Sequence, residues 1–160
     1  MNRKMYATAA AVVLLAFGAS GSAQAQSNSP SCNNKLIRGN YGVTLQGTKL
    51  VGPGPTGPQV GVAVSEYDGL GNFTQIDTVT INGEVVADFT HTPATGTYTV
   101  NPNCTGTFTI NFTDGRPTVT TNFVVVDNGN EIDAVVTSAG GNQGVLATAS
   151  VSKRRFSTIK

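Results

Sequence analysis

The stretch from Gly96 to Thr113 constrains the fold more than any other part of the sequence. It contains two runs in which threonine alternates with apolar residues, the first around Tyr98 and the second around Phe108. Alternation with a period of two is typical of a β-strand with one buried face. Between the two runs stands Asn-Pro-Asn-Cys-Thr-Gly, a composition typical of turns. The stretch therefore predicts a β-hairpin whose turn carries Cys104.

Short runs of the same kind follow one another along the chain and are separated by turn residues. We predict strands at 39–47, 60–66, 73–81, 84–89, 97–100, 107–112, 118–126, 131–137 and 145–152. About nine short strands at this spacing predict an all-β fold. Because nearly every connection is as short as a hairpin loop, we prefer an up-and-down antiparallel β-barrel of about eight or nine strands. A β-sandwich is the alternative, with the Gly- and Pro-rich loop at 49–59 as its one candidate crossover.

The first 25 residues have the composition of a secretory signal peptide. Arg3 and Lys4 give a positive start, residues 7–17 are apolar, and Ala23-Gln24-Ala25 is a small-x-small cleavage site. The apolar run is shorter than the about 20 residues that a membrane-spanning helix needs. We therefore predict cleavage before Gln26, export to the periplasm or the cell exterior, and no membrane span.

The rest of the chain divides into three parts by composition. We predict a flexible lead-in at 26–38 that contains Cys32, a barrel domain at 39–152 and a basic tail at 153–160. Without Arg3 and Lys4, the chain carries one more acidic than basic residue. Such a near-neutral body lacks the basic face of a nucleic-acid-binding protein, so we expect no nucleic-acid partner. The sequence indicates no particular oligomeric state.

The chain has two cysteines, Cys32 and Cys104. An even number of cysteines in an exported protein predicts a disulfide, which here would join the lead-in to the turn of the hairpin. Two free thiols are the alternative.

Two segments resemble parts of small exported bacterial proteins of uncharacterised function. They are Tyr67-Asp-Gly-Leu-Gly-Asn-Phe73 and the hairpin segment from Gly96 to Thr107. The meander around a central Gly-x-Tyr hairpin is also similar in outline to calycin-type barrels, and to the barrel shared by allene oxide cyclases and plant dirigent proteins. This resemblance implies a cavity that holds an apolar small molecule, and it carries over no catalytic residue.

Glu66 is the candidate for a functional acid. It follows Val60, Val62 and Val64 with a period of two, so strict alternation points it into the barrel. A carboxylate in that position suits a general acid or the anchor of a ligand. Because Glu66 stands at a strand end, a solvated residue at the rim is the alternative.

Three aromatic residues complete the predicted ligand site. Tyr41, Tyr98 and Phe123 lie on the apolar faces of their strands and are expected to point toward the same interior as Glu66. For the two tyrosines, the alternative is a core position whose hydroxyl reaches a partner or the rim.

Two other segments are interpreted as structural. His91 stands near Pro93 and is interpreted as an exposed loop residue rather than a catalytic one. The segment 127–133 is rich in oxygen ligands but lacks EF-hand spacing, so a turn with solvent-facing acids is preferred over a calcium site. With one histidine and two cysteines expected to be paired, we predict no metal site and no cofactor.

Two classes of function stay open at this point. In the first, an exported barrel binds an apolar small molecule or has a structural role. In the second, a cyclase- or isomerase-type enzyme uses the cavity to shape its substrate, and Glu66 supplies an acid. A buried Glu66 beside Tyr41 or Tyr98 would favour the enzyme, and a fully packed barrel would favour a structural role.

Overall fold

The structure is a computed structural model of the chain, and it describes residues 31–91, 93–139 and 146–155. The predicted signal peptide at 1–25, part of the lead-in at 26–30, the turn at 140–144 and the end of the basic tail at 156–160 lie outside the described residues. Among the described residues, no helix has the length and apolar character needed to cross a membrane.

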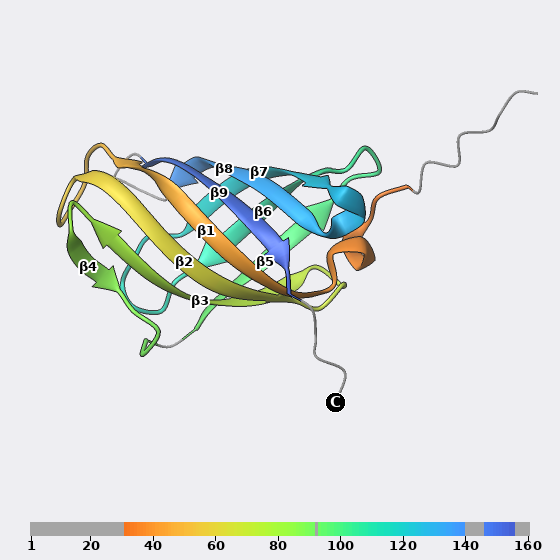
Figure 1. Ribbon diagram of the computed structural model, residues 1–160, viewed down its shortest axis with the longest axis horizontal. Helices are drawn as coiled ribbons and strands as arrows, with labels where there is room; N and C mark the ends of the chain where they lie inside the picture. Colours follow the sequence, from red (N-terminus) through yellow and green to blue (C-terminus); the bar gives the residue numbers. More distant parts are fainter. Residues whose placement is uncertain (1–30, 92, 140–145, 156–160) are drawn as a thin grey trace, which may run out of the picture.

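Nine strands and two short 3-10 helices make up the described chain. They are η1 (Asn34–Ile37), β1 (Gly39–Lys49), β2 (Gly57–Tyr67), β3 (Asn72–Ile81), β4 (Glu84–Ala87), β5 (Ala94–Val100), β6 (Thr105–Asn111), β7 (Val119–Val126), η2 (Asp127–Gly129), β8 (Glu131–Ala139) and β9 (Leu146–Arg154). Eight strands pair antiparallel in the order β2-β1-β9-β8-β7-β6-β5-β3, and β2 also pairs with β3 (Figure 1). The predicted up-and-down barrel is confirmed, with β4 as an extra strand on β3.

The central hairpin forms as predicted. β5 pairs with β6 so that Tyr98 lies opposite Phe108, and both side chains are buried. Cys104 stands in the turn with a positive φ of 65°, and its carbonyl accepts a hydrogen bond from the Val125 amide at 2.8 Å. Each of the two strands has a buried glycine, Gly96 on β5 and Gly106 on β6. A Cβ at Gly96 would lie 2.3 Å from the Phe73 ring, so the space beside the ring requires glycine there. The alternation of Gly and aromatic residues thus lets large rings lie flat across the interior.

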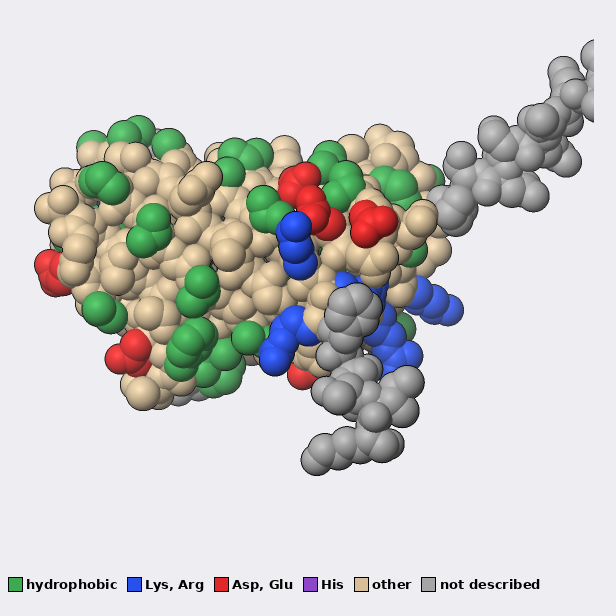
Figure 2. Space-filling model, viewed as in Figure 1, with side chains coloured by type: hydrophobic (Ala, Val, Ile, Leu, Met, Phe, Trp, Pro, Cys, Tyr) green, Lys and Arg blue, Asp and Glu red, His purple; other side chains and the backbone are tan. Residues whose placement is uncertain are grey.

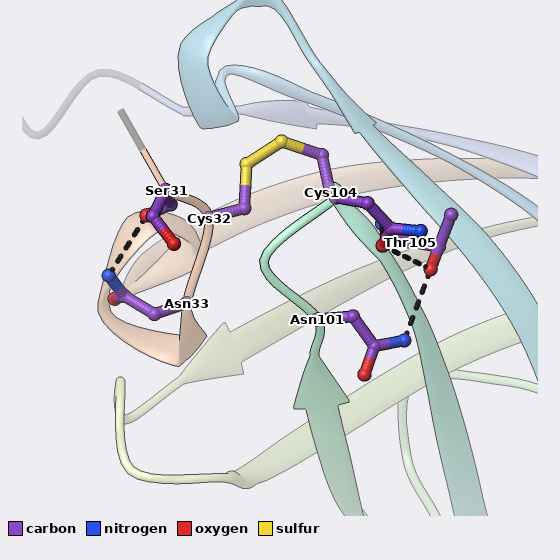
Figure 3. The surroundings of a disulfide bond; sticks show 7 residues. Ser31, Cys32, Asn33, Asn101, Cys104 and Thr105 are labelled. Atoms are coloured by element: carbon purple, nitrogen blue, oxygen red, sulfur yellow. Dashed lines mark hydrogen bonds between the residues drawn. A yellow bond between two sulfur atoms is a disulfide. The ribbon is translucent and has the colours of Figure 1, made fainter. Parts of the chain in front are cut away.

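The predicted disulfide between Cys32 and Cys104 is present (Figure 3). It joins the residue just before η1 to the turn between β5 and β6, across 72 residues of sequence. Both cysteines lie at one end of the barrel, which we call the closed end. There the disulfide holds the lead-in against the strands.

The entry into the first strand differs from the prediction. Residues 26–38 were predicted as a flexible lead-in, but residues 34–37 within it form the 3-10 helix η1, which packs across the closed end. The Asn33 side chain accepts a hydrogen bond from the Lys35 amide, and the Asn34 carboxamide oxygen accepts one from the Val100 amide at 2.8 Å. Ile37, the last residue of η1, is fully buried. Tertiary contacts of this kind, rather than helical periodicity, produce so short a helix.

The prediction for the inward face of β2 is wrong. Val60 and Val62 are 57% and 47% exposed, whereas Ala63, Ser65 and Tyr67 are buried. The interior is narrow, and rings from other strands fill it, so β2 supplies mainly small side chains there. Apolar side chains are accordingly scattered over the outer surface (Figure 2).

Both ends of the Gly- and Pro-rich segment also belong to strands. β1 continues to Lys49, which pairs with Gly57, and β2 already includes Pro58. The expected loop at 49–59 is therefore reduced to residues 50–56. Pro58 is exposed at the start of its strand, a position that tolerates a residue without a backbone donor.

The predicted basic tail begins inside the barrel wall. β9 continues to Arg154, whose Nη2 donates hydrogen bonds to the carbonyls of Leu36 at 2.7 Å and Gly129 at 2.8 Å. Its guanidinium also lies 4.9 Å from the centre of the Tyr41 ring. Arg154 therefore ties η1 and η2 together at the closed end, a role that composition alone did not indicate.

Candidate functional site

Aromatic rings fill the closed half of the barrel. Tyr67 lies within 5.5 Å, between ring centres, of four other rings, and the Phe108 and Phe123 rings stack at 4.1 Å. The six rings of this cluster belong to Tyr41, Tyr67, Phe73, Tyr98, Phe108 and Phe123. Such packing leaves no room for a ligand in this half.

The three aromatic residues of the predicted ligand site all belong to this cluster. The Tyr41 hydroxyl donates to the Gly129 carbonyl, and the Tyr98 hydroxyl accepts a hydrogen bond from the Gly69 amide at 2.9 Å. Burial raises the pKa of both hydroxyls, so they stay protonated at neutral pH. Tyr41 and Tyr98 therefore lie in the alternative, structural position, and Phe123 is likewise part of the core.

Glu66 lies on the outside of the barrel. It is exposed on β2, and it borders a shallow outer depression together with Asp68 and Asn72. The expectation that strict alternation points Glu66 inward is wrong, because the valines of β2 form the outer face. The structure does not bring Glu66 together with Tyr41 or Tyr98.

The other half of the barrel is hollow. It encloses a cavity of about 380 Å³ that opens at the end away from the disulfide. Its apolar lining comes from nearly every strand of the barrel and includes Val43, Leu45, Val79, Ile81, Ile110, Val119, Val136 and Leu146. Pro53, Gly54 and Pro55 of the β1–β2 loop lie at its mouth. The volume falls within the range of small-molecule pockets.

Small inward-facing residues explain why this half is hollow. Where the closed half has aromatic rings, the lining here has Thr121, Ala134 and Thr148. Gly47 adds no side chain, and a Cβ there would lie 2.2 Å from the Ala147 carbonyl oxygen of the neighbouring strand. The close approach of β1 and β9 thus excludes a larger residue at this position.

A buried carboxylate lies in the wall of the cavity. Asp77 of β3 is 2% exposed, and Arg116 donates two parallel hydrogen bonds to it at 2.7 and 2.8 Å. Arg116 also donates from Nε to Asp114 at 2.8 Å. The Nε2 atom of His91 lies 3.1 Å from Asp77 Oδ1. We call these four residues, Asp77, His91, Asp114 and Arg116, the wall cluster.

The short strand β5 explains the position of the wall cluster. β5 pairs with β3 only as far as Gln75, and β4 begins to pair with β3 at Val79. Asp77 lies between these two pairings, where one flank of β3 has no neighbouring strand. The loop that carries Arg116 fills this opening, so charged side chains complete the wall where the ladder is interrupted.

The charges in the wall cluster are mutually satisfied. Burial alone would lower the pKa of Arg116, but its hydrogen bonds to Asp77 and Asp114 raise that pKa above its usual value. Burial would likewise raise the pKa of Asp114, but the hydrogen bonds and charge of Arg116 lower it. Arg116 and Asp114 therefore stay ionised around neutral pH.

His91 is less exposed than expected. Its side chain is only 13% exposed, and its Nδ1 contacts the Asp88 carbonyl while its Nε2 faces Asp77 and Arg116. Both ring nitrogens are thus engaged within the protein. The segment 127–133 forms η2 and the start of β8. Among the described residues, no group of three or more His, Cys, Asp or Glu side chains is placed so that it could hold a metal ion.

Two uncharged amides complete the polar lining. Gln75 of β3 and Gln59 of β2 both line the cavity. The Gln75 Oε1 accepts a hydrogen bond from the buried Ser65 hydroxyl at 3.0 Å. Sequence reasoning missed Gln75 and Asp77, although both are in phase with Phe73, Val79 and Ile81 along β3. That shared phase is the signal that could have found them.

The fold and the cavity together define a closed eight-stranded antiparallel barrel that is packed in one half and hollow in the other. No protein-family model matches the sequence, and no curated protein or solved structure is significantly similar to it.

Proposed function

We propose that the protein is an exported carrier or receptor that binds a largely apolar small molecule in the hollow half of the barrel. The observation that carries this proposal is the cavity of about 380 Å³ with its mainly aliphatic lining. Burial of apolar ligand surface against such a lining is favourable by about 25 cal/mol per Å² before the costs of binding are subtracted. The polar group at the site is Asp77 with its partners, in place of Glu66.

The lining favours binding over catalysis. Asp77 and Asp114 are both hydrogen-bonded to Arg116, and His91 contacts Asp77. A general acid or base needs access to the reacting atoms, which these contacts restrict. The cyclase- or isomerase-type enzyme therefore ranks second, and the likeness to calycin-type and dirigent-type barrels stays a prediction.

Export is supported by two features. The first 25 residues have signal-peptide composition, and the disulfide between Cys32 and Cys104 is of the kind that persists in oxidising compartments. We therefore place the protein in the periplasm or outside the cell.

Two substitutions on the same strand test the binding function. Val136 lines the cavity, whereas its neighbour Val135 points outward and is half exposed. Val136→Phe should fill the cavity and abolish binding, and Val135→Phe should leave binding unchanged. Binding is measured as small molecules that co-purify with each protein, identified by mass spectrometry, and as the rise in melting temperature on adding apolar probes. If neither assay detects a ligand with the unsubstituted protein, a structural role replaces the proposal.

A further inference from the structure

The cavity holds a polar group that the protein does not satisfy. Gln75 faces inward next to Ser65, and the Ser65 hydroxyl donates to its Oε1 at 3.0 Å. This bond assigns the oxygen of the carboxamide to Ser65 and leaves Nε2 as a donor. Among the described residues, Nε2 has no hydrogen-bond partner. A donor enclosed without a partner costs free energy that an acceptor on a ligand would recover.

Gln75 also lies at the depth where the packed half begins. It is two residues along β3 from Phe73, which belongs to the aromatic cluster, and it pairs across the strands with Ser65 and with Ala94, both buried. The Gln75 amide is therefore at the floor of the cavity. A ligand enters from the open end, so the group that contacts Gln75 is the end of the ligand that enters first. The rest of the ligand then lies between Gln75 and the mouth of the cavity.

The charged groups around the cavity already have hydrogen-bond partners within the protein. Asp77 and Asp114 share Arg116, and the Lys49 ammonium at the mouth donates to the Pro53 carbonyl. Two cationic and two anionic side chains line the cavity, so the lining has no net charge. A charged ligand group at the floor would lose its hydration without a free counter-charge there, which is strongly unfavourable.

We infer that the ligand is an uncharged amphiphile, such as a ketone, ester or lactone, whose acceptor oxygen binds Nε2 of Gln75 at the cavity floor. Its apolar body lies along the aliphatic lining of the hollow half. This inference rests on the proposed function and names the ligand class of the same cavity. Gln75 is the specificity-determining residue, because its Nε2 is an amide donor at the floor without a hydrogen-bond partner among the described residues. The Thr121 and Thr148 hydroxyls also line the cavity and are buried without a partner, so they are further contacts for a polar ligand group.

Four eight-carbon probes with different head groups test the inference: 2-octanone, octane, octanoate and octylammonium. Each is titrated into the purified protein, and its dissociation constant is measured by calorimetry near neutral pH. The ketone should bind at least about tenfold more tightly than either ion, because each ion would have to lose the hydration of its charged head group in the cavity and the ketone would not. It should also bind more tightly than octane, which offers no acceptor.

Substitution of Gln75 gives the second part of the test. Gln75→Leu should weaken 2-octanone binding about fivefold to tenfold and leave octane binding unchanged, since one hydrogen bond is lost. Gln75→Glu, which keeps the side-chain length, should weaken ketone binding and improve octylammonium binding. Thr74→Val, at the exposed neighbouring position on β3, is the matched control and should change none of these affinities.

The possible outcomes distinguish failure of the role of Gln75 from failure of the proposed ligand binding itself. Equal affinity for octane and 2-octanone, with no effect of either Gln75 substitution, would overturn the inference and leave the binding function in place. The inference would also be overturned if octanoate bound more tightly than 2-octanone and Lys49→Met removed this preference. That result would indicate a ligand whose anionic group binds Lys49 at the mouth. If no probe binds to the unsubstituted protein, the proposed function fails together with the inference. Should Gln75→Leu not fold, Gln75→Glu and the ranking of the four probes decide the matter.

Discussion

At the scale of single residues, Asp77 determines how the barrel wall is completed. A carboxylate that is 2% exposed is unfavourable unless its charge is compensated, and Arg116 compensates it with two parallel hydrogen bonds. Arg116 in turn stacks on the Phe112 ring, with its guanidinium carbon 3.9 Å from the ring centre. The loop that carries Arg116 is thus held against β3 by charge and by packing together.

Removal of Arg116 should therefore be costly. Arg116→Met should lower the free energy of unfolding by about 3–5 kcal/mol, because it leaves the Asp77 charge buried with His91 as its one remaining partner among the described residues. The double variant Asp77→Asn, Arg116→Met should recover part of this loss, since it removes the buried charge as well. Urea unfolding measures all three proteins.

An exposed ion pair provides the control for this prediction. Lys153 pairs with Glu131 at 3.2 Å, but the Lys153 side chain is 73% exposed. Lys153→Met should change the free energy of unfolding by less than about 1 kcal/mol. Similar losses for Lys153→Met and Arg116→Met would contradict the role assigned to the wall cluster.

Alternation along one strand does not tell which of its faces is buried. On β2, Val60 and Val62 are outside and Ala63 and Ser65 are inside, which inverts the usual assignment and moves Glu66 to the surface. The cause lies on other strands, because the rings that cross the narrow interior require small neighbours. The inward face could be predicted on β5 and β6, where aromatic and polar residues alternate without ambiguity, and at Tyr41 and Phe123, which lie in the interior as expected.

At the scale of elements, local sequence predicted the hairpin but not η1. The hairpin has its own signals, namely two alternating runs around a turn with Pro102 and Cys104. η1 is four residues long, and it depends on contacts with distant residues such as the hydrogen bond from the Val100 amide to Asn34. No local pattern contains that information.

The disulfide should stabilise the closed end without affecting the cavity. The double variant Cys32→Ser, Cys104→Ser should lower the free energy of unfolding by about 2–4 kcal/mol, because the bond closes a long loop in the unfolded chain. Affinity for the cavity probes should stay within about twofold of the unsubstituted protein, since neither cysteine lines the cavity. Urea unfolding and calorimetry measure the two quantities. A large loss of affinity at unchanged stability would contradict this assignment.

At the scale of the whole molecule, short connections were enough to predict the closed barrel. The hollow half was not predictable in the same way, because it depends on how far each strand extends. β5 begins at Ala94, level with Gln75 rather than with the end of β3, and this leaves the opening that Arg116 fills. The inward phase of Gln75 and Asp77, by contrast, could have been predicted from the sequence, because they alternate in step with Phe73, Val79 and Ile81 on the same strand.

Hydrogen exchange should show the two halves as regions of different stability. Backbone amides beside the aromatic cluster, such as those of Phe108 and Phe123, should exchange at least about tenfold more slowly than those of Val79 and Val119, because fewer packed side chains protect the hollow half. Addition of a ligand should slow exchange mainly in the hollow half. NMR exchange rates for single amides measure both effects, and equal protection along every strand would count against the division.

The division of the interior has a consequence for how such a protein changes over generations. Because the aromatic cluster, the disulfide and Arg154 hold the barrel together at one end, partly buried residues of the cavity lining outside the wall cluster should tolerate substitution better than the aromatic residues do. Positions such as Val136 and Leu146, which line the cavity and are only partly buried, are where we expect substitutions to change the ligand rather than the fold. Related barrels could therefore bind different ligands while keeping the same packed aromatic half.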